Sequence, residues 1–180
     1  ARINDHFTVS SVDGTQHQII VTLIGTNDIP VFNAIAAQDA VEEGAKVTGQ
    51  LLSTDADTGD TLIYSSGSSV AGFTLNADGS YSFDPSDAAY RHLAEGATQL
   101  LTIPITVTDS QGATATQDLI ITLTGTNQEA VIAGVDTGNV QKEGFTESSH
   151  LLETNGQLTV SDPDDNEASF VAHSGADALV

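Results

Sequence analysis

The sequence lacks cysteine, methionine and tryptophan altogether, and it has only four Lys and Arg among 180 residues. The absence of cysteine excludes disulfide bonds and zinc sites with cysteine ligands. The scarcity of basic side chains excludes the ordinary mode of nucleic-acid binding, in which clustered Lys and Arg contact phosphates. No apolar run approaches the roughly 18 residues of a membrane-spanning helix, and no basic-then-apolar signal peptide begins at Ala1. We therefore expect neither a nucleic-acid partner nor direct insertion into a membrane.

Acidic side chains dominate the charge of the chain. Asp and Glu number 25, which gives a formal net charge of −21 at pH 7. A charge of this sign disfavours contact with anionic lipid head groups. Two interpretations remain: a solvated, self-repelling surface that keeps the protein soluble, or carboxylates held so close together that they need a cation. The spacing of the residues has to distinguish them, and a hard cation is the inorganic partner that this composition favours.

A repeat of 100 residues runs through the chain. Gly25-Thr26-Asn27 recurs as Gly125-Thr126-Asn127, and the alternating apolar residues that precede these segments match in register. The segment 49–57 resembles 156–164 with an offset of 107, which predicts a seven-residue insertion within 147–155. Self-similarity of this kind is typical of repeat architectures.

We interpret the chain as three pieces of that repeat. Residues 1–27 are the C-terminal strands of one repeat, 28–127 are a complete repeat, and 128–180 are the N-terminal part of a following one. The first and last pieces lack the strands that would complete their sheets, and unpaired sheet edges invite pairing with other chains. We therefore expect a homo-oligomer in which the tail of one molecule complements the head of another.

The three pieces are predicted to be all-β. Apolar and polar residues alternate with a period of two in 19–23, 101–107 and 119–123, where Thr, Val and Ile are common. Turn signals such as Asp13-Gly14 and Asp78-Gly79 separate such runs. Short strands between turns, within a unit of 100 residues, predict a seven-strand antiparallel Greek-key β-sandwich.

Three local features refine this prediction. The alternation within 73–83 indicates a hairpin, and the segment 85–95 is the one place for a helical turn, with Tyr90 and Leu93 packing inward. Pro104 falls inside an otherwise good strand. Because proline is expected at strand edges, strand starts or bulges, we expect a bulge or a break there.

The strongest chemical signal is a set of acidic residues near the ends of predicted strands. Asp55 and Asp57 point to one face of an extended segment, and Asp60 follows them. Asp109 closes a strand, and Asn27-Asp28 lies in the link between repeats. Strand ends at one pole of an antiparallel sandwich come together, so these residues can converge. Ca²⁺ takes about six to eight oxygen ligands from carboxylates, Asn side chains and carbonyls, and carboxylates packed together without an ion would be costly.

Four segments of the central piece match the pattern of a known family: Gly72–Phe83, Leu93–Gly96, Thr106–Gly112 and Gly125–Asn127. Together they resemble the VCBS repeat, a cadherin-like sandwich found in tandem in large bacterial surface adhesins of the RTX type, which are exported by type I secretion. The resemblance implies a cadherin/immunoglobulin-like fold in tandem and an extracellular location at the bacterial cell surface. It also implies a role in cell adhesion or biofilm formation.

The likeness to cadherins further implies Ca²⁺ between successive domains. At the first joint the implied ligands are Asn27, Asp28, Asp55, Asp57 and Asp109. At the second joint they are Glu43 (or Glu42), Asn127, Asp162 and Asp164. Position 128 is Gln where position 28 is Asp, so the second site loses one carboxylate, and Ser11 stands where Asp109 stands.

Turn formation is the competing interpretation of several acidic residues. Asp and Asn are common in turns because their side chains bond the local backbone. Asp13 and Asp78, each followed by glycine, are expected in turns and not at a metal. Asp162-Pro163 is equally consistent with the opening of a turn.

The expected function is that of a structural spacer whose joints are stiffened by Ca²⁺ and whose partners are the neighbouring repeats. A module that binds a surface glycan or a protein receptor is the alternative, and an exposed aromatic cluster at one pole would favour it. A glycoside hydrolase is less favoured, because its paired acids need a sugar-shaped cleft and tryptophan platforms are absent. The five His residues lack metal-binding spacing and no Gly-x-Ser-x-Gly motif occurs, so no enzyme is expected.

Overall fold

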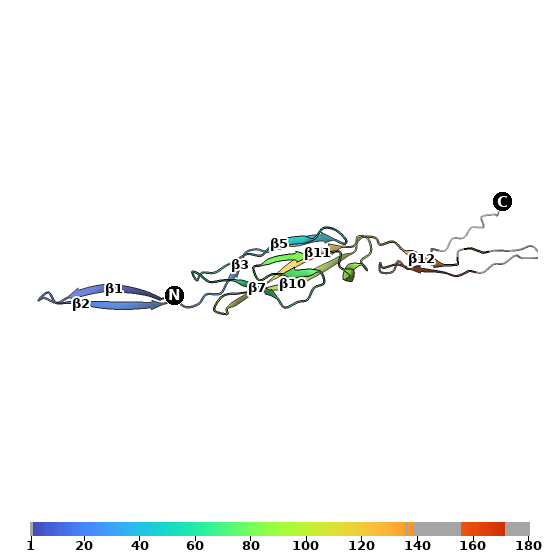
Figure 1. Cartoon of the computed structure of the whole chain (residues 1–180). Helices are drawn as coiled ribbons and strands as arrows, with labels where there is room; N and C mark the ends of the chain where they lie inside the picture. The colour runs from blue at the N-terminus through green and yellow to red at the C-terminus, as the bar shows by residue number, and fades with distance from the viewer. Residues whose placement is uncertain (1, 136, 139–155, 172–180) are drawn as a thin grey trace, which may run out of the picture.

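The computed structural model describes residues 2–135, 137–138 and 156–171. The insertion expected within 147–155 lies outside these residues. In the described part, the strands form three groups that follow one another along an elongated chain (Figure 1).

The first group is a two-stranded antiparallel hairpin in which β1 (Arg2–Ser10) pairs with β2 (Gln16–Ile24). The amide of Ser11 donates to the carbonyl of Thr15 at 2.9 Å, and the amide of Gly14 donates to the carbonyl of Ser11 at 3.0 Å. Gly14 has φ of 86°, a conformation that glycine adopts without steric cost. Among the described residues, no further strand pairs with this hairpin.

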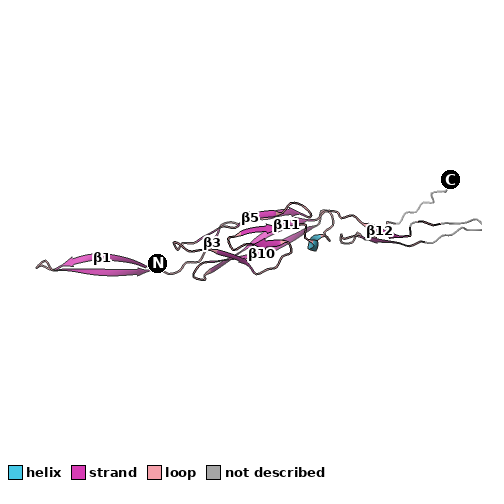
Figure 2. Cartoon of the chain, in the orientation of Figure 1, coloured by secondary structure: helices cyan, strands magenta, loops and turns pink. Residues whose placement is uncertain are grey.

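The second group is a sandwich of two sheets (Figure 2). One sheet has the order β4–β11–β10–β7 and is formed by β4 (Gln38–Val41), β11 (Thr114–Thr124), β10 (Thr98–Thr108) and β7 (Ile63–Ser66). The other has the order β5–β9–β8 and is formed by β5 (Val47–Gln50), β9 (Ser80–Phe83) and β8 (Phe73–Leu75). The short strands β3 (Val31–Phe32) and β6 (Ser53–Thr54) pair with each other, and η1 (Ala88–Tyr90) is a single 3-10 turn.

The third group pairs β12 (Val131–Gly134) with β13 (Leu158–Ser161). Val131 lies opposite Ser161, just as Val31 lies opposite Thr54 in the β3–β6 pair. The two pairings are related by the offsets of 100 and 107 that the sequence repeat has. The beginning of the central fold is therefore built a second time at residue 131.

The core lies between the two sheets of the sandwich. Side chains of a strand point alternately to opposite faces, and every second residue of β10 and β11 faces inward. Six of these inward residues are completely buried: Ile103, Ile105, Val107, Leu119, Ile121 and Leu123. Phe83 of the facing sheet is also completely buried, and its ring meets that of Tyr90 edge-on with centroids 5.5 Å apart. The predicted all-β sandwich is confirmed.

Two details of the predicted sandwich are corrected. The central piece has nine strands, β3 to β11, and not seven, because the segments 31–41 and 47–54 each contain two short strands, β3 with β4 and β5 with β6. The pairing is also not wholly antiparallel, since β4 runs parallel to β11 with Gln38 opposite Ile121. The separation of β3 from β4 explains the parallel pair. β3 pairs with β6, and the chain then crosses to the sheet of β10 and β11, where β4 pairs with β11.

The bulge or break expected at Pro104 is absent. β10 and β11 keep one register throughout, from Thr98 opposite Thr124 to Thr108 opposite Thr114. The Ser66 hydroxyl donates to the Pro104 carbonyl at 3.1 Å, which shows that the main-chain groups of Pro104 face β7. The β7 pairing ends one residue earlier, at Ile105 opposite Ser66. The missing amide of Pro104 therefore costs no ladder hydrogen bond, as proline in a strand requires.

The other local predictions are confirmed. β8 and β9 form a hairpin with Leu75 opposite Tyr81, and Gly79 closes its turn with φ of 86°. The helical turn η1 falls within 85–95, and Tyr90 and Leu93 are buried beside it. The Tyr90 hydroxyl donates to the carbonyl of Ala71 at 2.8 Å, which ties this turn to the start of the hairpin.

Asp84, at the end of β9, gives the fold a predictable acid dependence. The Ser86 hydroxyl, the Lys46 ammonium 2.9 Å away and the Ser86 amide lower the pKa of Asp84 to about 2. A carboxyl whose pKa is lowered by folding stabilises the protein above its ordinary pKa of about 3.9, and this contribution is lost as the pH falls through the folded value. We expect Asp84→Asn to flatten the loss of stability between about pH 4 and pH 2. Urea unfolding across this range measures the effect, and an unchanged slope would contradict it.

Candidate metal centre

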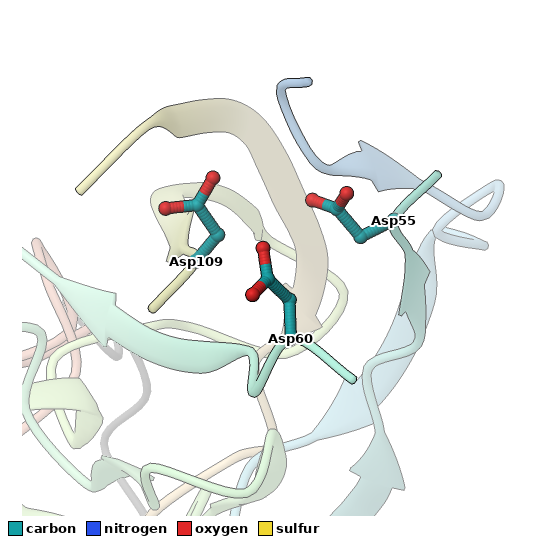
Figure 3. Close-up of side chains that lie close together, drawn as sticks. All are labelled: Asp55, Asp60 and Asp109. Atoms are coloured by element: carbon teal, nitrogen blue, oxygen red, sulfur yellow. The ribbon is translucent and has the colours of Figure 1, made fainter. Parts of the chain in front are cut away.

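Three carboxylates gather at the pole of the sandwich that faces the hairpin β1–β2. Asp55 follows β6, Asp60 precedes β7, and Asp109 follows β10. Each offers one oxygen, and these oxygens all lie within 4.8 Å of one another (Figure 3). Within the described residues this is the one group of three or more such side chains. Three segments distant in sequence therefore bring negative charge to one point.

Asp109 is fixed by local hydrogen bonds. Its Oδ1 accepts from the amides of Gln111 and Ala113, each at 2.8 Å, which closes the turn after β10. Its Oδ2 accepts from the Asn27 side-chain amide at 2.8 Å. The bond from Asn27 lowers the pKa of Asp109, helped by the amides of the turn. Asp109 is therefore held ionised, buried and attached to the linker that precedes the sandwich.

Asp55 and Asp60 each present an oxygen without a partner. The Oδ2 atoms of both residues are buried and accept no hydrogen bond. The other oxygen of Asp60 accepts from the Ser110 hydroxyl, and that of Asp55 accepts from the amide of Asp57 at 2.8 Å. A buried carboxylate oxygen without a donor is costly. A cation among the three side chains would satisfy both oxygens at once.

Asp57 holds the linker and is not part of the group of three. Its Oδ2 accepts from the main-chain amide of Asp28 at 2.8 Å. Both residues of the link are thus held: the side chain of Asn27 bonds Asp109, and the main-chain amide of Asp28 bonds Asp57. We call residues 25–28 together with the residues that they contact the first joint.

The second joint, at residues 125–128, repeats the contacts that Asp57 makes at the first. The amide of Gln128 donates to Asp164 Oδ2 at 2.7 Å, and the amide of Asp164 donates to Asp162 Oδ1 at 2.9 Å. These are the bonds that Asp28, Asp57 and Asp55 make at the first joint. Asp164 is buried, and its Oδ1 has no partner.

Glu42, and not Glu43, reaches the second joint. Glu42 is 2% exposed, its Oε2 accepts from the amide of Thr126 at 3.0 Å, and its Oε1 is buried without a partner. Glu43 is exposed in the turn after β4, with φ of 57°. Asn127 is also exposed, and its side-chain amide donates to the carbonyl of Gln128, at 3.1 Å. At the second joint, therefore, Glu42 and Asp164 contact the linker and Asp162 bonds the amide of Asp164, whereas Glu43 lies in a turn.

The family resemblance alone missed Asp60 as a member of the group of three. The sequence carries a signal for it, because Asp55, Asp57 and Asp60 form a run with acidic residues at the first, third and sixth positions. Asp78 and Asp13 lie in turns as expected, where they accept bonds from Ser80 and from Ser11 and Thr15. The donor set at the first joint consists wholly of oxygen, which suits a hard cation such as Ca²⁺.

A family model and one solved structure agree with this architecture. Residues 27–125, more than half of the chain, match the model of the bacterial cadherin-like domain. A search of curated proteins finds no match. Among solved structures, the chain is similar to extracellular cadherin domains 1–4 of protocadherin gamma B7, with a TM-score of 0.53 and 16% identity over 98% of this chain and 56% of the other. The extracellular domain of protocadherin gamma B4 matches with a TM-score of 0.43 and 14% identity, over 91% of this chain and 31% of the other.

The structural likeness to the gamma B7 fragment concerns the fold alone, because the identity is low, and the chain spans about half of the length of that fragment. The family match rests on the sequence of the central sandwich itself. It begins at Asn27 and ends at Gly125, and so includes Asp55, Asp60 and Asp109. The chain belongs to the family of bacterial cadherin-like domains.

Proposed function

We propose that the chain is a spacer segment of a large secreted bacterial adhesin, in which Ca²⁺ at the joints turns a flexible series of sandwiches into a rod. The observation that carries the proposal is the pair of buried, unpartnered carboxylate oxygens of Asp55 and Asp60 beside Asp109. Cadherin-like domains are extracellular modules for adhesion or structure, and in general they are not enzymes. In its finer form, the proposal is a VCBS-type repeat of an RTX adhesin, exported by type I secretion, with a role in cell adhesion and biofilm formation.

The residues of the first joint would couple the ion to the linker. Asp109 is bonded to Asn27, and Asp55 is bonded to Asp57, which in turn holds the amide of Asp28. An ion that fixes Asp55 and Asp109 would therefore also fix both residues of the link. Without the ion, repulsion among the three carboxylates opposes the same arrangement.

The second joint supports the same role for the other end of the sandwich. Glu42 and Asp164 each have a buried oxygen without a partner, and they contact the linker at Thr126 and Gln128. The proposed ligands there are Glu42, Asp162 and Asp164, with Asn127 beside them. Neighbouring repeats of the same chain are then the partners of the central sandwich at both poles.

The concentration of Ca²⁺ would decide when the rod forms. Extracellular calcium modules bind with Kd values of about 10⁻⁴ to 10⁻³ M. Sites in this range are loaded outside a cell and empty in the cytosol. The chain would then be pliant before export and stiff afterwards, without any need for disulfide bonds, which the absence of cysteine excludes.

The alternative of a glycan- or receptor-binding module has less support. The aromatic side chains of the central sandwich belong to its core. Tyr64, Tyr81, Phe83 and Tyr90 are buried, and Phe32 and Phe73 pack against the core. A surface cavity of about 310 Å³ lies between the segment 33–38 and the segment 48–52, with Tyr81 in its wall. No carboxylate lines this cavity, so it also lacks the paired acids of a glycoside hydrolase.

The distance between two spin labels across the first joint tests the proposal. Because the chain has no cysteine, Val12→Cys and Glu95→Cys give two unique labelling sites, one in the hairpin turn and one near the far pole of the sandwich. We expect a broad distance distribution in EDTA that becomes narrow when Ca²⁺ is added. Mg²⁺, which prefers fewer protein ligands in a stricter geometry, should have a smaller effect.

A second label pair provides the control. Thr74→Cys and Glu95→Cys both lie within the central sandwich, and their distance should not respond to Ca²⁺. A distribution across the joint that is equally broad with and without Ca²⁺ would refute the stiffening role. A change in both pairs would mean that Ca²⁺ acts on folding of the sandwich and not on the joint.

A further inference from the structure

One edge of the central sandwich has no partner strand. The sheet order β5–β9–β8 makes β5 an edge strand, and within the described part of the chain no strand pairs with its outer side. β3 pairs with β6, which follows β5 along the chain, but β3 does not continue beside β5. The main chain crosses to the other sheet instead. The surface cavity of about 310 Å³ lies between this crossing segment, 33–38, and the segment 48–52.

The hydrogen bonds on the two sides of this strand show which main-chain groups face the cavity. The Leu51 amide donates to a carbonyl of the β8–β9 hairpin at 2.9 Å, whereas the Leu52 carbonyl accepts from the Asn33 amide, on the other side, at 2.9 Å. Main-chain groups of successive residues in a strand point to opposite edges. Those of Thr48 and Gln50 therefore point away from β9 and towards the cavity. Among the described residues, no partner is found for these N–H and C=O groups.

The wall of the cavity also holds a buried hydroxyl. Tyr81 of β9 is 7% exposed, and its ring crosses β5 at Gly49, where a Cβ would collide with the ring and with the hydroxyl. The Tyr90 hydroxyl has an acceptor, but in the described part no hydrogen bond is found for that of Tyr81. Burial raises the pKa of Tyr81, so its hydroxyl is protonated and can donate. A hydrogen-bond donor is thus held ready beside the free edge.

No charged side chain lines the cavity, although the chain has a net charge of −21. Natural sheets protect their exposed edges with charged side chains, with proline or with bulges. β5 has the sequence Val-Thr-Gly-Gln, which contains neither a charge nor a proline, and it pairs with β9 in one register without a bulge. The edge of β5 therefore lacks the features that prevent another strand from pairing with it.

We propose that the free edge of β5 binds an extended peptide of a partner protein, which adds a fourth strand to the sheet β5–β9–β8. Thr48 to Gln50 span about 7 Å, so about three residues of the peptide pair with this edge. In such complexes main-chain hydrogen bonds supply affinity, and pockets for alternate side chains supply specificity.

The cavity indicates which side chain the peptide carries. The peptide residue opposite Gly49 points inward, as Gly49 does, towards the Tyr81 hydroxyl and the apolar side chain of Leu51. An uncharged side chain with both a methyl group and a hydroxyl, such as threonine, matches this position. None of the three carboxylates of the metal centre lines the cavity, so the inference does not rest on the proposed function.

An NMR titration of the ¹⁵N-labelled whole chain with the peptide acetyl-Thr-Val-Thr-Val-Thr-amide, in EDTA, tests the proposal. We expect saturable shifts of the amide signals of 33–38 and 48–52. Two forms of the peptide, N-methylated on the Thr or on the Val amides, are the controls. Because a strand pairs through one of its edges, one form should bind like the parent peptide. The other loses several hydrogen bonds and should bind at least about tenfold more weakly.

Two variants separate binding from folding. Tyr81→Phe removes only the hydroxyl, so the melting midpoint should not fall, whereas the affinity for the peptide should fall by about two- to tenfold. Thr48→Pro removes an amide that faces away from β9, at a position where an edge strand tolerates proline, and it should abolish binding. Thr48→Val keeps that amide and should bind like the natural chain. Unchanged amide signals of β10 and β11 show that each variant remains folded.

Several results would overturn the proposal. One is the absence of saturable shifts in 48–52 with the peptide at millimolar concentration, and another is equal binding of the two N-methylated peptides. Unchanged binding by Thr48→Pro would equally exclude pairing with β5. Shifts confined to β7 or β8 would place the peptide on a different edge. An unchanged affinity in Tyr81→Phe would contradict the contact with the hydroxyl.

Discussion

Addition of Ca²⁺ to the metal-free chain is expected to raise the melting midpoint of the central sandwich by about 10–20 °C. A ligand that binds only the folded state stabilises it by about 2.7 kcal/mol at 100 times Kd. In a domain of about 60–100 residues, each kcal/mol moves the midpoint by roughly 4–8 °C. Mg²⁺ should give a smaller shift, and EDTA should reverse the effect of Ca²⁺.

Asp60→Asn distinguishes the effect of Ca²⁺ binding on the melting midpoint from an effect on the fold itself. The variant removes one of the three carboxylates that converge at the first joint and keeps the size of the side chain. In EDTA its midpoint should be equal to or above that of the natural chain, because one source of repulsion is gone. In Ca²⁺ it should lose most of the shift, because a ligand and a charge are missing.

Asp118→Asn is the matched control, since Asp118 lies exposed on β11, opposite Pro104 and outside the group of three carboxylates. Its response to Ca²⁺ should equal that of the natural chain. If Asp60→Asn and Asp118→Asn respond alike, the stabilisation comes from general screening of negative charge and not from a site. If neither the natural chain nor any variant responds to Ca²⁺, the proposed metal centre is wrong, and the sandwich fold is not affected by that result.

Replacement of Phe83 by Ala is expected to destabilise the central sandwich by about 3–5 kcal/mol, as truncation of a buried phenylalanine usually does. Phe83 is completely buried, and its ring contacts that of Tyr90. The site should be lost together with the fold, because Asp55, Asp60 and Asp109 are held only by the strands that the core joins. Urea unfolding measures the loss of stability, and the Ca²⁺ response should disappear wherever the variant is unfolded.

Ser82→Ala provides the comparison on the same strand. Ser82 lies on the outer face of β9, where its hydroxyl bonds that of Thr74 at 2.9 Å. Surface substitutions of this kind usually change stability by no more than about 0.5 kcal/mol. A loss in Phe83→Ala no larger than that in Ser82→Ala would mean that the two sheets do not enclose a common core.

Alternation of apolar residues was sufficient to predict the strands that line the core. In β10 and β11 every second residue is Leu, Ile or Val over much of the strand, and one face of the hairpin is buried, so the pattern and the structure coincide. The division of the first strand into β3 and β4 was not predictable in this way. The division depends on which sheet β3 and β4 each join. Strands of two and four residues are too short for their apolar periodicity to indicate this.

The candidate site was predicted in part for a related reason. Asp55 and Asp109 stand next to strands whose ends are fixed by the core, so their convergence followed from the fold. The choice between Glu42 and Glu43 depends on one residue of register at the end of β4, where the turn begins and alternation no longer applies. Glu43 takes the left-handed conformation of that turn, which leaves Glu42 to face the linker.

The way in which Asp57 and Asp164 hold the linkers has a consequence for how such proteins vary. Each carboxylate accepts from a main-chain amide, that of Asp28 in one case and that of Gln128 in the other. Every amino acid except proline supplies that amide. The direction in which one module leaves the next can therefore persist while the residue at this position drifts, and proline is the substitution that would bend the whole array.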